Sequence, residues 1–179
     1  LRYEDRTQVT PIGGLQPGCK QLIEAEVLQV AVNFRRQGPS RRMLVAKLED
    51  HSGLLTIRLF FFSSGQQQML QKGNKLRLFG EVRIAQGELE MVHPEFAVVD
   101  PHNPPPLEKN LTPIYPTTEG LHQLSISKII RQVITHLNQD DMPETLPEYW
   151  LAQNSFPDFK SAMLSLHSPQ QQTDTQLIA

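Results

Sequence analysis

The sequence of 179 residues has one cysteine, one tryptophan and no long uncharged apolar run. With a single thiol, Cys19, no disulfide can form within the chain, which fits a reducing compartment. No apolar stretch approaches the roughly 20 residues that a bilayer-spanning helix needs, and no N-terminal segment has the form of a signal peptide. We therefore expect a cytoplasmic protein with no membrane partner.

Motifs that carry catalysis are also missing. The chain has no GxxxxGK[ST] phosphate loop, so we expect no nucleotide-hydrolysing engine within it. Its six histidines are scattered, with no CxxC and no pair at ligand spacing, which argues against a metal site. Asp50, His51 and Ser52 adjoin in "DHSG", which is typical of a tight turn and not of a nucleophile with its base. We expect no catalytic residue, metal or cofactor here.

Residues 19–100 have the pattern of a small β-barrel. Five strands are predicted, separated by the "DHSG" turn, a short helix over 63–73 closed by Gly73, and a hairpin around Gln86-Gly87. This order is typical of an OB-fold, a five-stranded Greek-key barrel. The expected strands are 21–34, 41–50, 54–62, 74–86 and 87–100.

Two irregularities are expected in these strands. The apolar phase of the first strand slips near Val27 and Leu28, which predicts a β-bulge. Pro94 cannot donate a backbone hydrogen bond, so the last strand should end there, bulge or lie on an edge.

The rest of the chain has a different character. The stretch 101–116 is a proline-rich connector, and 125–138 places six apolar residues on one helical face, with Ser125 as a plausible N-cap. Shorter helices are expected near 147–153 and 157–167. The fold class is therefore mainly β with appended helices. The predicted parts are a lead-in over 1–18, the barrel over 19–100, a connector over 101–120, a helical segment over 121–167 and a polar tail over 168–179.

Charge is strongly segregated along the chain. The formal charge is -2, yet between Arg35 and Arg83 ten basic residues stand against three acidic ones, which gives this block +7 and the remainder -9. Interspersed charge serves solubility better, so a basic centre suggests a polyanionic partner. Four of the arginines, Arg35, Arg36, Arg41 and Arg42, surround one Gly-Pro turn next to Phe34. A solvated hairpin tip is the plainest interpretation of that turn taken alone.

Strand alternation places phenylalanines and cations together on one face of the predicted barrel. Single-stranded nucleic acid is bound by such a combination, because cations hold phosphates while aromatic rings stack on bases. The strands 2–3 face and the loop before it form the ligand surface of an OB-fold. For Phe79, burial under the C-terminal helices remains an alternative. The predicted outward set is Thr56, Arg58, Phe60, Phe62, Lys75, Arg77, Phe79, Glu81 and Arg83, and the inward set is Leu55, Ile57, Leu59, Phe61, Leu76, Leu78, Val82 and Ile84.

Several motifs carry a family resemblance, in chain order: "LRYEDRT", "DHSGLLTIRLFFF", "GEVR", "HPEF", "LTPIYPTTEGL" and "LHSP". With these motifs the sequence resembles the RecG family of bacterial branch-migration helicases. The resemblance implies an N-terminal part that holds the wedge domain, with two motor domains, ATP and Mg²⁺ in a remainder that is absent here. The start without methionine and the polar end fit such a piece of a longer protein.

The resemblance also implies a partner and a site. The family remodels replication forks and Holliday junctions, and its wedge aromatics are thought to stack on the parted bases. Here these would be Phe60 and Phe34, with Phe61 or Phe62 possible, and the partners would be forks, four-way junctions, single-stranded arms and the protein's own motor domains, in the nucleoid of a bacterium.

Two alternatives remain open at this stage. The barrel could be a scaffold whose aromatic face packs on the rest of its own protein, or it could bind single strands in general. The predicted stacking residues are Phe34, Phe60 and Phe62, and the predicted phosphate ligands are Arg35, Arg36, Arg41, Arg42, Arg58, Lys75, Arg77 and Arg83.

Overall fold

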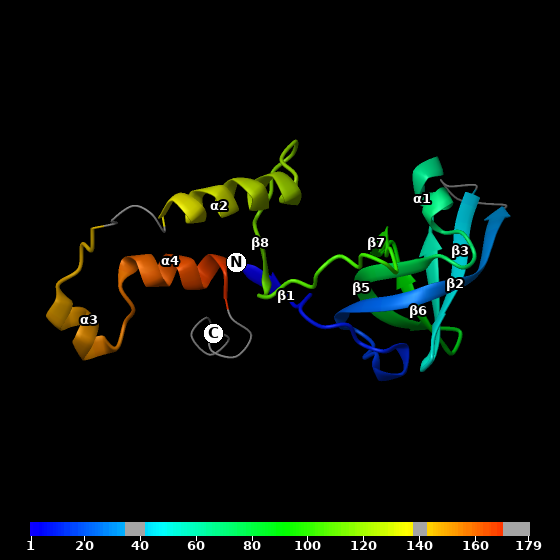
Figure 1. The fold of residues 1–179 in the computed structure, drawn as a ribbon, viewed down its shortest axis with the longest axis horizontal. Helices are drawn as coiled ribbons and strands as arrows, with labels where there is room; N and C mark the ends of the chain where they lie inside the picture. Colours follow the sequence, from blue (N-terminus) through cyan, green and yellow to red (C-terminus); the bar gives the residue numbers. More distant parts are fainter. Residues whose placement is uncertain (35–41, 138–142, 170–179) are drawn as a thin grey trace. The chain divides into compact units, whose positions relative to one another are not determined.

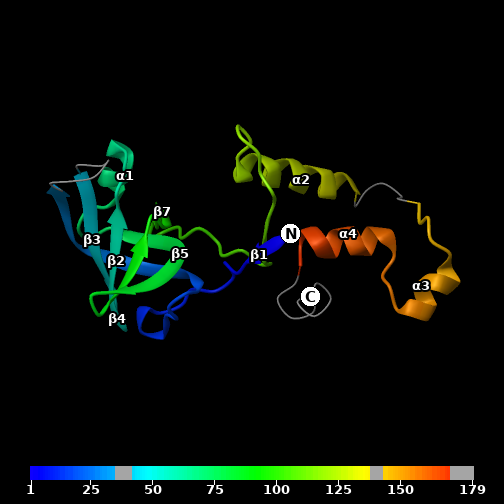
Figure 2. The ribbon, with the colours of Figure 1, turned by 180° about the vertical axis from the view of Figure 1, so that it is seen from behind.

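The computed structural model describes residues 1–34, 42–137 and 143–169, and the chain forms two compact units. One unit is Asp5–Leu107, and the other combines Leu1–Glu4 with the segment that begins at Glu108. Figure 1 traces both along the sequence, and Figure 2 gives the reverse view.

A closed barrel forms the first unit. Its strands are β2 (Lys20–Phe34), β3 (Arg42–Asp50), β4 (Gly53–Leu59), β5 (Lys75–Ala85) and β6 (Glu88–Val92), and β7 (Glu95–Val98) pairs with the first half of β5. The neighbour order is β2-β3-β4-β6-β5, and β2 closes the ring by pairing with β5. The β4–β6 pair is parallel, whereas the other pairs are antiparallel. This is the strand order of an OB-fold, so the predicted fold class is confirmed.

The long strand β2 serves two neighbours through a bulge. Residues 20–26 pair with β5 and residues 26–34 pair with β3, and the register shifts between Val27 and Gln29. A bulge bends a strand and increases its twist, which lets one strand belong to both sides of a small barrel. The bulge predicted near Val27 and Leu28 is confirmed.

The core includes a residue from the lead-in that the sequence pattern did not single out. Ile12, in a 3₁₀ turn over Ile12–Gly14, is 0% exposed and packs among the barrel residues. Its backbone N–H donates to Oδ2 of Asp50 at 2.9 Å. The other carboxylate oxygen, Oδ1, accepts from the N–H and hydroxyl of Ser52 and from the N–H of Gly53. The predicted "DHSG" turn is therefore present, and it also anchors the lead-in.

The short helix and the hairpin predicted between strands are also present. Helix α1 (Ser64–Met69) begins with a capping box in which Ser63 and Gln66 satisfy each other's backbone N–H groups. The helix ends before Gly73, whose φ of +88° forms the turn into β5. Gln86 and Gly87 both have positive φ, as a tight hairpin turn requires. Pro94 separates β6 from β7, as its missing N–H predicts.

The second unit pairs β1 (Arg2–Glu4) with β8 (Thr112–Ile114) and adds three helices. These are α2 (Gln123–Leu137), α3 (Glu148–Asn154) and α4 (Phe159–His167), at the predicted places. The ring of Tyr115 stacks on His167, and its hydroxyl lies 3.0 Å from Nδ1 of that residue.

Helix α2 differs from the prediction in its start and in its packing. It begins at Gln123, so Ser125 lies inside the helix and the predicted N-cap is wrong; the N–H of Ser125 donates to the carbonyl of His122 and so extends the first turn. On its apolar face, Ile129 and Val133 remain 55% and 49% exposed. Among the described residues, no helix is both long and apolar enough to span a membrane.

Candidate nucleic-acid interface

The three phenylalanines of "LFFF" lie just beyond β4 instead of inside it. The strand ends at Leu59, so the alternation predicted through residue 62 does not hold there. Phe61, predicted to point inward, is 66% exposed. Phe62, predicted to point outward, packs partly against the core. Alternation requires extended backbone, and the chain is already turning toward the capping box of α1.

His93 joins two of these phenylalanines into one aromatic cluster. The backbone N–H of Phe60 donates to Nε2 of His93 at 3.1 Å, and the two ring centroids are 5.8 Å apart. The ring of Phe61 stacks on His93 at a centroid distance of 6.2 Å with planes 23° apart. We call Phe60, Phe61 and His93 the aromatic platform. Its most exposed ring, Phe61, presents a π-face that could accept a base.

The platform lies at the end of the sheet where the arginine-rich turn emerges. Strand register places Phe34 opposite Arg42, and Leu44 opposite Leu59, the last residue of β4. Phe34 is 77% exposed, and the guanidinium of Arg42 lies 5.1 Å from the centre of the Phe62 ring. Arg42 is thus close to the aromatic segment, as predicted. The other three arginines of the turn, Arg35, Arg36 and Arg41, lie outside the described residues.

The remaining predicted phosphate ligands all have carboxylate partners within the barrel. Arg58 pairs with Glu90, and Arg83 pairs with Glu81. Lys75 and Arg77 both bind Glu24, at 2.9 Å and 2.7 Å. Of these glutamates only Glu24 and Glu90 lie outside the block of residues 35–83, so the pairs reduce its formal charge from +7 to +5. To bind a phosphate, each of these cations would have to exchange its glutamate for it.

Glu24 pairs with two cations, whereas Glu81 and Glu90 each pair with one of the predicted phosphate ligands. Burial raises its pKa, but the hydrogen bonds and charges of Lys75 and Arg77 outweigh burial, so the pKa of Glu24 lies below its ordinary value. The carboxylate therefore stays ionised and holds both cations at neutral pH.

Two residues of β5 depart from the predicted faces. Phe79, expected on the outward face, is 5% exposed, and the guanidinium of Arg6 from the lead-in lies 4.0 Å from its ring centre. Arg6 itself is held by two hydrogen bonds to Glu95. Ile84, expected to point inward, is 63% exposed near the hairpin end. Phe79 is thus not part of an exposed stacking surface.

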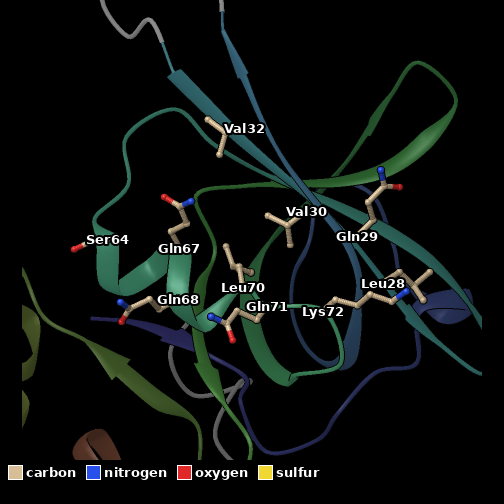
Figure 3. A pocket seen from close by; sticks show the side chains of 10 residues that line it. All are labelled: Leu28, Gln29, Val30, Val32, Ser64, Gln67, Gln68, Leu70, Gln71 and Lys72. Atoms are coloured by element: carbon tan, nitrogen blue, oxygen red, sulfur yellow. The ribbon is translucent and has the colours of Figure 1, made fainter.

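Two hollows in the barrel offer different chemistry from the platform. A groove of about 850 Å³ lies between β2 and the segment of α1, as Figure 3 shows. A second hollow, of about 520 Å³, carries four carboxylates, which oppose a phosphate chain. The groove is lined by Leu28, Gln29, Val30, Val32, Ser64, Gln67, Gln68, Leu70, Gln71 and Lys72, and the second hollow includes Glu24, Glu26, Glu49 and Asp50.

Neither hollow has the features of a stacking or metal site. Their described lining residues include no arginine, phenylalanine, tyrosine or tryptophan. Within the parts of the chain that the structure describes, no three His, Cys, Asp or Glu side chains gather to hold a metal ion. The platform and the neighbouring arginine turn are therefore the stronger candidate interface.

Comparison with known proteins decides the family. A family model described as the RecG wedge domain matches residues 2–137. The chain belongs to the RecG wedge domain family. The ATP-dependent DNA helicases RecG of Escherichia coli K12 and Haemophilus influenzae are each 38% identical to it over 170 residues. These alignments cover 94% of the chain and 24% of each relative, so the chain spans about a quarter of the length of the relatives it matches.

A solved structure agrees with this assignment at the level of fold. The structure of RecG bound to a three-way DNA junction aligns over 94% of this chain and 22% of that chain, with a TM-score of 0.66 and 24% identity. The resemblance identified from the sequence motifs is confirmed.

Within this RecG wedge domain, the sequence analysis missed one member of the platform. His93 belongs to the "HPEF" motif, which served only to mark the family. Its signal was the adjacent Pro94, which indicates that the strand ends or bulges at this point. The strand beside His93 is β4, because β4 and β6 pair in parallel with Arg58 opposite Val92.

Proposed function

We propose that this chain binds branched DNA, such as forks and four-way junctions, and acts as a passive wedge for a branch-migration helicase. The observation that carries the proposal is the exposed aromatic platform at the barrel end from which the arginine-rich turn emerges. Membership of the RecG wedge domain family supports it. The relatives named as ATP-dependent DNA helicases support the same role for the parent protein.

In this proposal the aromatic residues meet the parted bases. Phe61 stacks on the base at the branch point and blocks re-annealing, Phe60 supports it, and Phe34 contacts a second arm from the end of β2. Stacking on a base contributes roughly 1 to 3 kcal/mol and tolerates any sequence, which suits recognition of a branch instead of a site. Phe62 supports Arg42 and not a base, because its ring packs against the core and lies next to the guanidinium of Arg42.

The arginine-rich turn supplies the phosphate contacts. Arg35, Arg36, Arg41 and Arg42 grip the two arms, while the glutamate-paired Arg58, Lys75, Arg77 and Arg83 contribute less. ATP and Mg²⁺ act in motor domains outside this chain, in a cytoplasmic, nucleoid-associated enzyme. The wedge itself supplies binding and strand separation, with no catalytic step of its own.

The proposal is tested by titrating the 179-residue chain against a fork, a four-way junction, a plain duplex and a single strand of matched length, at two salt concentrations. We expect tighter binding to the two branched DNAs. Preference for the single strand would instead indicate a general single-strand binder.

A scaffold role is the second candidate, because two observations favour it. Arg58, Lys75, Arg77 and Arg83 pair with glutamates of the barrel itself, and α2 leaves Leu124, Ile129 and Val133 exposed for another part of the protein. In that case the chain would bind all four DNAs equally weakly and would associate with the parent's motor domains.

Replacing all four turn arginines, Arg35, Arg36, Arg41 and Arg42, by alanine should weaken binding to every DNA. For each phosphate that the variant no longer binds, the slope of log K against log[salt] should flatten by about 0.7 to 0.9. A titration from low to moderate salt measures this slope.

A matched control removes the same charge elsewhere, by alanine at Lys109, Lys128, Arg131 and Lys160 in the second unit. We expect this control to keep most of the slope. Equal flattening by both quadruple variants would refute a dedicated phosphate grip at the turn.

A further inference from the structure

His93 continues the hydrogen bonding between β4 and β6 beyond the last residue pair of these two strands. The strand pair β4–β6 ends with Arg58 opposite Val92, and the N–H of His93 then donates to the carbonyl of Arg58 at 3.0 Å. Beyond this bond, Pro94 has no N–H to offer and the chain turns away. The next N–H on the other side, that of Phe60, donates to the imidazole of His93. One residue therefore holds the end of β4 by its backbone and by its ring.

The backbone of His93 is shaped for this bridge. Its φ is +48°, in the left-handed region, where histidine is enriched relative to most side chains. The buried Pro94 that follows is held close to β5, because a Cβ on Gly80 would approach Cβ of Pro94 to 3.0 Å. The backbone that carries the imidazole is thus restrained by the close approach of Pro94 to β5.

The imidazole of His93 contacts both phenylalanines of the platform. Its Nε2 accepts a hydrogen bond from the N–H of Phe60. The same ring stacks on Phe61, which leaves one face of Phe61 supported by protein. His93 therefore restrains both the backbone before Phe61 and the plane of its ring.

We propose that His93 is a positioning residue that pre-organises the wedge aromatics for the base at a DNA branch. This inference rests on the proposed function and deepens it. Without the acceptor at Nε2, the backbone N–H of Phe60 loses its hydrogen bond to His93, and ordering Phe61 on a base then costs part of the stacking free energy. The role is exerted through Phe60 and Phe61, with no DNA contact required of His93.

Three substitutions separate the hydrogen bond, the ring and the backbone strain. His93→Gln has an amide oxygen at about the same distance along the side chain as Nε2, but it has no ring. His93→Phe keeps a ring but has no acceptor. His93→Asn suits positive φ, but its amide is too short to reach Phe60, so it controls for backbone strain. His51→Phe, at the exposed β3–β4 turn at the opposite end of β4, is the matched control.

The first measurement needs no DNA. Amide hydrogen exchange of Phe60, followed by NMR on the free chain, should be about tenfold faster in His93→Phe and His93→Asn, which corresponds to the loss of a hydrogen bond worth about 1.4 kcal/mol. His93→Gln and His51→Phe should stay within about threefold of the parent chain. Protection of Phe60 that persists in His93→Phe would overturn the inference.

The second measurement is the ratio of fork affinity to duplex affinity. We expect this ratio to fall about five- to tenfold in His93→Phe and His93→Asn, with rescue in His93→Gln and little change for duplex. A normal ratio in His93→Phe, while Phe61→Ala loses it, would overturn the assignment to His93 alone. A normal ratio in Phe61→Ala would instead refute the proposed wedge function.

Discussion

Replacing Phe61 by alanine should lower the affinity of the chain for a DNA fork by about 5- to 150-fold, while affinity for a plain duplex stays nearly constant. The reason is that a base stacked on an aromatic side chain contributes roughly 1 to 3 kcal/mol, and a fork presents an unpaired base at its branch whereas a plain duplex presents none. Binding titrations with matched fork and duplex measure both affinities. Stability should change little, because the side chain is 66% exposed.

Controls for this prediction are available in the same barrel. Ile84→Ala removes an apolar side chain of similar exposure, 63%, that belongs to no aromatic cluster, and it should leave the fork preference intact. Phe61→Trp should retain the preference, whereas Phe61→Leu should lose most of it because leucine has no π-face. A parallel decrease of fork and duplex affinity in Phe61→Ala would contradict the stacking role.

The second large effect is expected at Asp50, on stability instead of DNA binding. Asp50→Ala should lower the free energy of unfolding by about 2 to 4 kcal/mol at pH 7, because the carboxylate accepts four hydrogen bonds from three residues and three of the donors are backbone N–H groups, that of the buried Ile12 among them. Chemical denaturation measures the decrease. Asp100→Ala is a suitable control, since Asp100 accepts a bond from the N–H of His102 in an exposed turn.

The Asp50 contribution should also depend on pH with a definite sign. Burial raises the pKa of Asp50, but hydrogen bonds from Ser52, Ile12 and Gly53 outweigh burial, so its pKa in the folded chain is below the ordinary value. The stabilisation is therefore complete above the unfolded pKa, near 4, and is lost as pH falls through the lower folded pKa. The difference in stability between the parent chain and Asp50→Ala should shrink below about pH 4; a constant difference would contradict this origin.

Much of the barrel was predictable because its signals are local. The bulge near Val27, the "DHSG" turn and the Gln86-Gly87 hairpin each depend on a few adjacent residues whose backbone preferences agree with the fold. The inward positions of Leu55, Ile57 and Leu59 followed from alternation, which holds as long as the strand is extended.

The candidate site was harder to predict because it depends on register and on strand ends. No local sequence signal indicates that β4 ends at Leu59, so Phe61 was assigned to the core although it is exposed. The pairing of Arg77 with Glu24 follows from the β2–β5 register, which joins residues far apart in the sequence. The outward direction of Arg77 was thus predictable from alternation, but its neutralisation was not.

The double pairing of β2 also constrains the order in which the barrel can fold. Strands β3 and β4 are joined by a tight turn and can associate as soon as both exist, whereas Glu26 must find Lys75 about 50 residues later in the chain. Loop-closure entropy opposes that late contact until the intervening strands are compact. We therefore expect the β2–β5 seam to be the last part of the ring to form, so that the barrel closes only when β5 reaches β2.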